Sequence, residues 1–265
     1  MLLKTRLLQF RDKTIGLNII LRQMREIEDK IDGNISKDKS HWKLITFGSF
    51  KLLLDSRSMV DATILKEGDW ECDSWQALRE IFGQSPDIAK IFLDVGSYFG
   101  LYALKAFETK DFSRILAFEA DKVNASQLRS SLLLNDLLSE IEIFEMFVSD
   151  SLGQKSMAMS SNWYLNRGMA GTEDHRATKR SIVGSKAMDD VISECNQFIV
   201  MKVDVEGGEL AVLNGARNLF AHNKVLLMIE NISNAKEQRK ILEKLGFKLV
   251  LEIPKDCNWI WKNYD

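Results

Sequence analysis

The sequence predicts an α/β protein in which a mostly parallel sheet carries helices on both faces. Three observations predict this class: five nearly continuous apolar runs, helical segments that separate them, and a pair of glycines directly after the first run. Strands buried on both faces are apolar along their whole length, and parallel neighbours need helical crossovers. The five strands are expected at residues 91–95, 114–120, 142–150, 197–205 and 224–231.

Helices are expected between these strands and after the last one, at 99–108, 122–135, 187–195, 209–221 and 235–246. Two further apolar stretches, FKLVLEIP and NWIWKN, predict an antiparallel hairpin at the sheet edge and bring the expected strands to seven. Residues 151–185 are polar and irregular in pattern, so a long loop is expected there.

The residues ahead of the sheet predict a less regular lead-in. Residues 42–66 suit short strands and turns, and residues 74–82 suit a helix with Ser74 as its N-cap. The chain therefore divides into an N-terminal amphipathic helix (1–33), a lead-in (34–90) and the α/β core (91–265).

The N-terminal segment carries a seven-residue apolar repeat, at Leu3, Phe10, Leu17, Met24 and Ile31. Such a repeat is typical of an amphipathic helix with a coiled-coil-like seam. Three roles stay open: packing on its own domain, self-association into a homo-oligomer through residues 1–31, and contact with an anionic membrane surface.

Composition excludes several classes of function. The 265 residues carry a net charge of −2, so no global basic field indicates a nucleic-acid partner. The three cysteines lie far apart and form neither a disulfide framework nor a zinc motif. No apolar run reaches the roughly 20 residues that span a bilayer, and Lys4, Arg6 and Arg11 interrupt any signal peptide. We expect a cytoplasmic protein.

The turn after the first strand, IFLDVGSYFG, favours S-adenosylmethionine over a dinucleotide. Gly96 and Gly100 allow a close backbone approach, but the bulky Tyr98 stands where a pyrophosphate would need a third glycine. The Asp94 carboxylate suits an ammonium group and repels phosphate. S-adenosylmethionine carries an ammonium group and no phosphate. A turn that serves packing alone is the alternative.

Two further strand ends add acidic groups. Glu119 ends the second strand, beside the glycine turn, where a carboxylate can accept hydrogen bonds from both ribose hydroxyls. The block MKVDVEGGELAVLNGA places Lys202, Asp204, Glu206 and Glu209 around the end of the fourth strand. Ligands bind at this edge of open α/β sheets, and surface salt bridges are the alternative explanation of the charges.

Taken in order, the motifs DVGSYFG, FEAD, FVSDSLG, AMDDVI and KVDVEGGELAVLNGA resemble the FkbM family of S-adenosylmethionine-dependent methyltransferases. The resemblance runs from about residue 68 to about residue 250. It implies a Rossmann-like class I methyltransferase fold, with a mostly parallel seven-stranded sheet, and methylation of hydroxyl oxygens on carbohydrates or polyketide-type natural products. The acceptor implied is a small molecule or a glycan.

The resemblance also implies a cofactor cleft. Its residues are Asp94, Gly96, Ser97, Tyr98 and Gly100 at the turn, Glu119 at the ribose, Ala120, Val148, Ser149 and Asp150 at the adenine, and Glu71 at the methionine end. Three positions depart from the family pattern. Tyr98 replaces a common Asn, Ala120 replaces a Pro, and Asn231 follows Glu230 where a His often appears one residue later.

Methyl transfer needs an aligned nucleophile and a base for the hydroxyl proton. We expect Asp204 to be that base or its orienting partner, Lys202 to stabilise the alkoxide, and Glu206 and Glu209 to shape the pocket. Glu206 as an anchor for the turn is the alternative. Glu230 is a further catalytic candidate at the adjacent strand end.

A metal is the less favoured option at the same strand ends. Asp204, Glu230 and Asn231 form a hard oxygen set suited to Mg²⁺ or Mn²⁺. Paired carboxylates at strand ends also bind hydroxyls directly, so we predict a site without a metal.

The expected loop offers a lid. Its side chains include candidates for stacking on a sugar or hydrogen bonding to it: Trp163, Tyr164, Asn166, Arg167 and His175. A surface loop without that role is the alternative, and His175 is a second candidate base.

A nucleic-acid methyltransferase and a non-catalytic scaffold are the alternative functions. A nucleic-acid methyltransferase that acts on exocyclic amines would show a Pro-Pro-aromatic block at the fourth strand end, whereas this chain has VDVEGGE. A non-catalytic scaffold with the same fold stays open.

Overall fold

The computed structural model describes residues 40–84, 90–159, 163–167, 179–232 and 234–265. The predicted N-terminal helix, and with it the predicted oligomer contact, lies outside the described residues. None of the helices within these ranges is long and apolar enough to cross a membrane.

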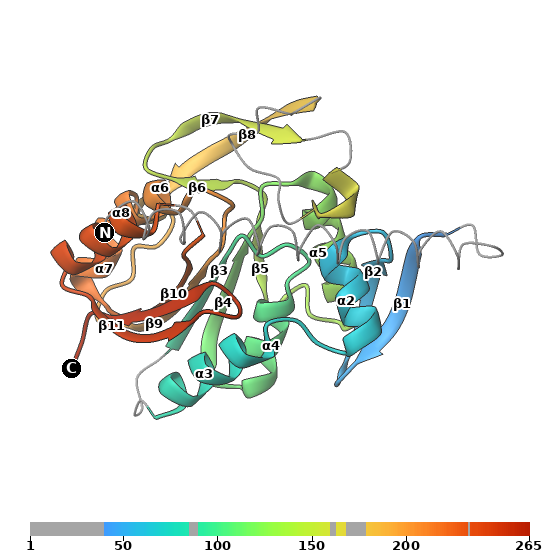
Figure 1. The fold of residues 1–265 in the computed structure, drawn as a ribbon, viewed down its shortest axis with the longest axis horizontal. Coiled ribbons are helices and arrows are strands. Elements are labelled where there is room, and N and C mark those ends of the chain that lie inside the picture. The colour runs from blue at the N-terminus through green and yellow to red at the C-terminus, as the bar shows by residue number, and fades with distance from the viewer. Residues whose placement is uncertain (1–39, 85–89, 160–162, 168–178, 233) are drawn as a thin grey trace, which may run out of the picture.

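A seven-stranded sheet with strand order β11-β12-β10-β9-β3-β4-β5 forms the centre of the molecule (Figure 1). Its strands are β3 (Lys90–Val95), β4 (Phe112–Phe118), β5 (Glu142–Phe144), β9 (Phe198–Val203), β10 (Lys224–Glu230), β11 (Lys248–Ile253) and β12 (Asn258–Lys262). The five strands from β10 to β5 are parallel, and β12 is antiparallel to both of its neighbours. The predicted sheet and its edge hairpin are confirmed.

Helices cover both faces of the sheet (Figure 1). They are α3 (Cys72–Gly83), α4 (Leu101–Thr109), α5 (Lys122–Leu134), α6 (Glu209–Asn214), α7 (Arg217–His222) and α8 (Ala235–Lys244). Phe92 of β3 packs in the core layer that includes α3, α4 and α5, whereas Ile91 and Leu93 pack in the layer that includes α6, α7 and α8. Successive strand side chains point to opposite faces, so a wholly apolar strand supplies both layers.

The region after β5 corrects the sequence prediction. The strand expected over 142–150 divides into β5 and β6 (Phe147–Ser149). β6 joins a separate three-stranded sheet with β7 (Gly153–Met159) and β8 (Lys179–Ala187), in a segment expected to be a loop. Much of this small sheet is exposed, so its strands are largely polar and resemble a loop in sequence.

The prediction of a short helix at 187–195 is also wrong. The chain forms only a 3₁₀ turn, η3 (Met188–Asp190), after β8. The Asp189 carboxylate accepts hydrogen bonds from the backbone N–H groups of Asn218 and Leu219, at the start of α7. Asp189 of this motif therefore caps a helix that is distant in sequence and does not begin a helix of its own.

The lead-in is more helical than predicted. The hairpin of β1 (Trp42–Phe47) and β2 (Phe50–Asp55) is followed by helix α2 (Met59–Glu67). Helix α3 begins at Cys72, so Ser74 is not its N-cap. The Ser74 hydroxyl instead donates to the Asp256 carboxylate (2.6 Å) in the β11–β12 turn.

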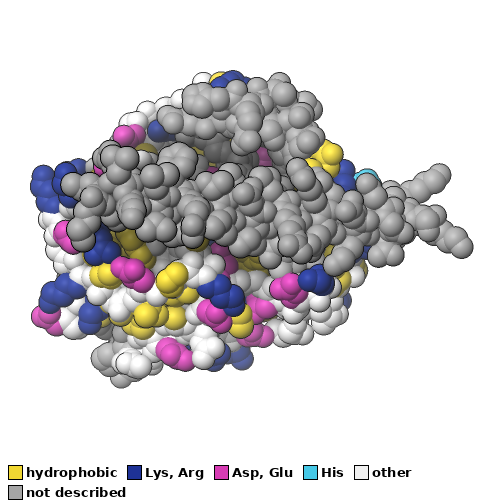
Figure 2. Space-filling model, viewed as in Figure 1, with side chains coloured by type: hydrophobic (Ala, Val, Ile, Leu, Met, Phe, Trp, Pro, Cys, Tyr) yellow, Lys and Arg dark blue, Asp and Glu magenta, His cyan; other side chains and the backbone are white. Residues whose placement is uncertain are grey.

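Figure 2 shows one face of the molecule. On the part of this face that is coloured, basic and acidic side chains are interspersed and do not separate by sign.

Candidate active site

The two glycines after β3 are required by packing. A Cβ on Gly96 would lie 1.7 Å from the carbonyl oxygen of Asp204, and a Cβ on Gly100 would lie 2.3 Å from Leu128 Cδ1. Both glycines have positive φ angles. What approaches Gly96 in this structure is the backbone of the turn after β9, so a cofactor contact at these glycines stays a prediction.

Asp94 has a buried carboxylate with free acceptor capacity. Its Oδ2 accepts a hydrogen bond from the Ala103 N–H (3.0 Å), whereas Oδ1 is buried and has no partner among the described residues. Burial raises the pKa of Asp94 to about 6, although the Lys202 ammonium opposes the shift. The nearby Ser97 Oγ is also buried without a partner in the described part of the chain. A cationic ligand would satisfy the free carboxylate oxygen.

Glu119 lies at the end of β4, where it was expected, but both of its oxygens are already engaged. Oε2 accepts from the Tyr98 N–H (2.8 Å) and Oε1 from the Asp121 N–H (2.7 Å). Burial raises the pKa of Glu119 to about 8. Each carboxylate oxygen can accept a second hydrogen bond, so a role at the ribose stays a prediction.

Tyr98 directs its side chain toward the lead-in. Its hydroxyl forms a hydrogen bond with Ser58 Oγ (2.7 Å), and the Arg167 guanidinium lies over its ring, 5.3 Å from the centroid. Its backbone has a positive φ of 52°. The prediction that Tyr98 belongs to the cofactor turn therefore rests on its backbone N–H, which reaches Glu119.

Lys202 joins the turns that follow β3 and β9. Its Nζ donates to the Gly96 carbonyl (3.2 Å) and to Asp204 Oδ2 (3.1 Å), and it lies over the Tyr102 ring. Burial opposes its charge, yet the carboxylates of Asp204, Asp94 and Glu71 raise the pKa of this ammonium well above its usual value. These contacts show a bracing group. The predicted role at an alkoxide stays a prediction.

The acidic residues predicted from the VDVEGGE block do gather. Burial, together with the charge of Asp204, raises the pKa of Glu206 to about 8 and that of Glu230 to about 9. Glu209 accepts from the Gly207 N–H (3.0 Å), and its Oε2 is buried without a partner in the described ranges. Glu209 thus holds the turn, whereas Asp204 keeps 27% of its side chain exposed. Asp204 is a partly exposed carboxylate that is paired with the Lys202 cation.

Glu71 adds a carboxylate from the lead-in to this group of acidic side chains. It stands at the start of α3 and accepts a hydrogen bond from the Tyr102 hydroxyl (2.8 Å). Burial raises its pKa to about 7, and the charges of Lys202 and Asp204 also act on it. The hydrogen bonds from Ser74 to Asp256 fix this end of α3 against the β11–β12 turn.

The amide of Asn231 is engaged elsewhere. In the orientation that satisfies both of its ends, it donates to the Cys257 carbonyl (3.2 Å) and accepts from the Trp259 indole N–H (2.6 Å). No group of three or more His, Cys, Asp or Glu residues in the described ranges has an arrangement that could hold a metal ion. The optional metal set of Asp204, Glu230 and Asn231 thus gains no support from the geometry.

Ser149 and Asp150 lie at the end of β6. Ser149 is buried and its hydroxyl donates to Asp150 Oδ1 (3.0 Å), which lowers the pKa of the exposed Asp150. The Ser149 carbonyl stands 1.9 Å from the place that a Cβ on Gly215 would occupy. This packing fixes the turn, and its expected contact with adenine stays a prediction.

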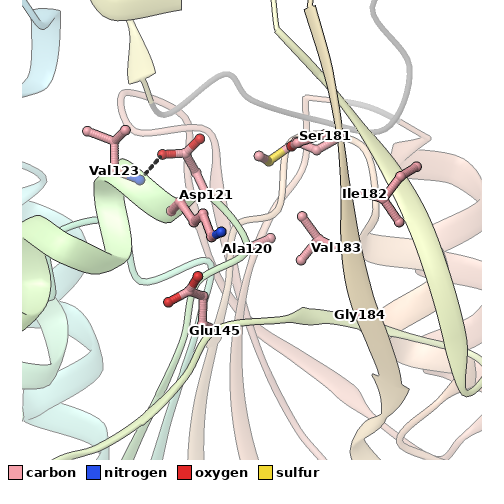
Figure 3. A pocket seen from close by; sticks show the side chains of 10 residues that line it. Ala120, Asp121, Val123, Glu145, Ser181, Ile182, Val183 and Gly184 are labelled. Atoms are coloured by element: carbon pink, nitrogen blue, oxygen red, sulfur yellow. Dashed lines mark hydrogen bonds between the residues drawn. The ribbon is translucent and has the colours of Figure 1, made fainter.

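A cavity of about 390 Å³ opens beyond Glu119, between the start of α5 and the small sheet (Figure 3). Figure 3 shows Val183 and Ser181 of β8 facing Ala120 and Asp121. The cavity is lined by Ala120, Asp121, Lys122, Val123, Glu145, Met157, Ser181, Ile182, Val183 and Gly184. Of the predicted cofactor residues, only Ala120 lines it. The contributions of β7 and β8 were missed because those strands were expected to be a loop.

The residues predicted to form a lid lie in different environments. Arg167 is buried, with only 1% of its side chain exposed, so the expectation that it meets a carbohydrate is wrong. The Arg57 guanidinium lies over the Tyr164 ring, 5.2 Å from the centroid. Asn166 is half-buried, and His175 lies outside the described residues. For Trp163, the described structure gives the backbone alone, as part of the 3₁₀ turn η1 (Trp163–Leu165).

The structure can now be compared with known proteins. A family model described as the methyltransferase FkbM domain matches residues 94–249, which is more than half of the chain. The chain belongs to the FkbM methyltransferase family. The match begins at Asp94 and extends into β11, so it covers the strand ends that carry the acidic residues.

Similar proteins include one curated relative and two solved structures. Methyltransferase sdnD of Sordaria araneosa is 27% identical over 172 residues, covering 52% of this chain and 66% of that protein. Methyltransferase FkbM from Methylobacillus flagellatus KT is 19% identical, with a TM-score of 0.47 over 72% of this chain and 48% of that one. The N-terminal domain of human METTL16 in complex with SAH is 13% identical, with a TM-score of 0.42 over 73% and 70%. This FkbM-family chain therefore spans about two thirds of the curated relative and about half of the first solved one.

Proposed function

We propose that this protein is an S-adenosylmethionine-dependent O-methyltransferase that acts on a hydroxyl of a carbohydrate or a related natural product. One observation carries the proposal. The buried Asp94 carboxylate, with its free Oδ1, lies one strand from Glu119 and one strand from the Lys202–Asp204 pair. Neighbouring strands are about 4.8 Å apart, so the three positions suit a single small ligand.

The residues present fit this cofactor. Asp94 Oδ1 and Ser97 Oγ are buried polar atoms without partners in the described part of the chain, and a cationic group with polar substituents would satisfy them. Glu119 has acceptor capacity left for ribose hydroxyls, and the cavity beyond Ala120 supplies a largely apolar wall. When bound, the cofactor supplies a methyl group on a sulfonium centre.

On the acceptor side, Asp204 is the residue assigned as base. The Lys202 ammonium lies 3.1 Å from its Oδ2, and the Asp204 side chain stays partly exposed. The raised pKa values of Glu206 (about 8) and Glu230 (about 9) keep these two groups protonated near neutral pH. Protonated carboxyls donate hydrogen bonds, so they can hold acceptor oxygens while Asp204 takes the proton.

A neutral, hydroxyl-bearing acceptor agrees with this set of groups. The carboxyl groups of Glu206 and Glu230, protonated near neutral pH, suit hydrogen bonds with the hydroxyls of such an acceptor. The net charge of −2 and the interspersed charges on the coloured face of Figure 2 also favour a small molecule or glycan over nucleic acid.

The test has two stages. Titration calorimetry should show binding of S-adenosylmethionine and none of NAD; binding of neither would favour a scaffold. Isotope-labelled S-adenosylmethionine is then offered with nucleotide sugars, glycan ends and small polyols. Transfer to a hydroxyl supports the proposal. Transfer only to an amine or to RNA would overturn the O-methylation and acceptor assignments.

A further inference from the structure

A buried arginine stands behind the cofactor turn. The Arg167 guanidinium lies over the rings of both Trp42 and Tyr98, 5.1 and 5.3 Å from their centroids. Its Nη2 donates to Asp61 Oδ2 (3.1 Å) and to Gln127 Oε1 (2.5 Å). A buried guanidinium is costly unless it is paired, so these contacts fix its place.

The same cluster ties several segments together. Asp61 Oδ2 also accepts from the Asp55 N–H (2.6 Å) and from Gln127 Nε2 (2.8 Å). The Arg167 carbonyl accepts from Asn124 Nδ2 (3.1 Å) on α5. The lead-in, helix α5 and the segment that carries Arg167 therefore meet at one polar centre.

Tyr98 connects this centre to Glu119. Its left-handed backbone is unfavourable for a non-glycine residue, so surrounding contacts must hold it. Three contacts do so: the Arg167 guanidinium packs on the Tyr98 ring, the Tyr98 hydroxyl forms a hydrogen bond with Ser58, and the Tyr98 N–H donates to Glu119. Displacement of the ring would turn that N–H away from the carboxylate.

We propose that Arg167 is a positioning residue for cofactor binding: its guanidinium, held by Trp42 and Asp61, packs on the Tyr98 ring, keeps the Tyr98 N–H on Glu119 and thereby orients that carboxylate. This inference rests on the proposed function, because it assigns Glu119 to the cofactor. The contact chain itself is independent of any ligand.

The test compares Arg167→Lys with Arg239→Lys. Arg239 also lies over two aromatic rings, Trp259 and Trp261, but it belongs to α8 and is more exposed. Lysine keeps the charge and loses the flat, forked head. Arg167→Lys should weaken S-adenosylmethionine binding about tenfold, and Arg239→Lys should leave it within twofold. A fall in melting temperature with unchanged affinity would show that Arg167 is merely structural.

Two further measurements distinguish a failure of this inference from a failure of the proposed function. Amide hydrogen exchange at Tyr98 should accelerate about tenfold in Arg167→Lys, whereas exchange at Ala103, bonded to Asp94, should not. If the unmodified protein fails to bind S-adenosylmethionine but Tyr98 exchange accelerates, the proposed function fails and the contact chain stands. In a double-mutant cycle, Arg167→Lys and Glu119→Gln should be non-additive for binding, and strict additivity would overturn the route through Glu119.

Discussion

The carbonyl oxygen of Asp204 fills the place where a side chain on Gly96 would begin, 1.7 Å from the position of its Cβ. The turns that follow β3 and β9 are therefore packed backbone to backbone, and the Asp204 N–H donates to the Val95 carbonyl (3.0 Å) beside them. Lys202 closes the same contact by donating to the Gly96 carbonyl. Asp204 and the turn after β3 therefore form one packed unit.

Gly96→Ala should disrupt this unit. A left-handed backbone costs alanine about 1–2 kcal/mol, and the steric overlap adds about 1–3 kcal/mol. Gly246→Ala is the matched control, because Gly246 has a similar positive φ and no atom within 4 Å of its Cβ position. Urea unfolding should show the larger loss for Gly96→Ala, together with lost S-adenosylmethionine binding. Equal losses in the two variants would refute the packing explanation.

Stability should fall as the pH rises. Glu71, Glu206 and Glu230 have pKa values raised to about 7, 8 and 9 in the folded protein, so the folded state holds protons that the unfolded state has released. The contribution is full below about pH 4.5 and is lost progressively toward pH 9. Melting temperature measured from pH 5.5 to 9 should therefore decrease, by about 2–4 °C for each kcal/mol lost.

Glu230→Gln should flatten that slope, because the amide carries no titrating proton. Glu80→Gln, on the exposed face of α3, is the control and should leave the slope unchanged. A melting temperature that stays constant or rises across this pH range would contradict the assigned pKa shifts.

The sequence predicted what local apolar pattern determines and missed what distant contacts determine. Nearly continuous apolar runs identify β3 and β9, since both strands are buried on each face. The strands β7 and β8 lack that signal because few of their described side chains are buried. Arg167 was predicted to be a lid residue because its contacts with Trp42 and Tyr98 join residues far apart in the sequence, and no local pattern predicts them. Asp61, which pairs with it, gave no signal for the same reason.

Asp204→Asn tests the assigned base. With an acceptor identified by the labelled screen, turnover should fall by about 10²–10⁴-fold, because the amide cannot take the hydroxyl proton. Calorimetry should show S-adenosylmethionine affinity within a fewfold of the unmodified protein. Asp136→Asn, at an exposed carboxylate outside the acidic group, serves as a charge-matched comparison for turnover. Retained turnover in Asp204→Asn would move the role to another group.

Removal of divalent metal should leave methyl transfer unchanged. The Asn231 amide is taken up by the Cys257 carbonyl and the Trp259 indole, which leaves an incomplete oxygen set at the strand ends. Transfer rates are compared before and after EDTA treatment and gel filtration. Loss of activity that Mg²⁺ restores would establish a metal-dependent reaction instead.

Tyr98→Asn and Tyr98→Phe together separate the role of the Tyr98 ring from that of its hydroxyl. Asparagine tolerates the left-handed backbone, but the ring beneath Arg167 and the bond to Ser58 are both lost, so these contacts no longer hold the N–H on Glu119. Tyr98→Phe removes only the hydroxyl and keeps the ring in place. We expect S-adenosylmethionine to bind about tenfold more weakly to Tyr98→Asn and within twofold of normal to Tyr98→Phe, as measured by calorimetry. Normal affinity in Tyr98→Asn would mean that the ring only fills space, and a large loss in Tyr98→Phe would assign the effect to the hydroxyl.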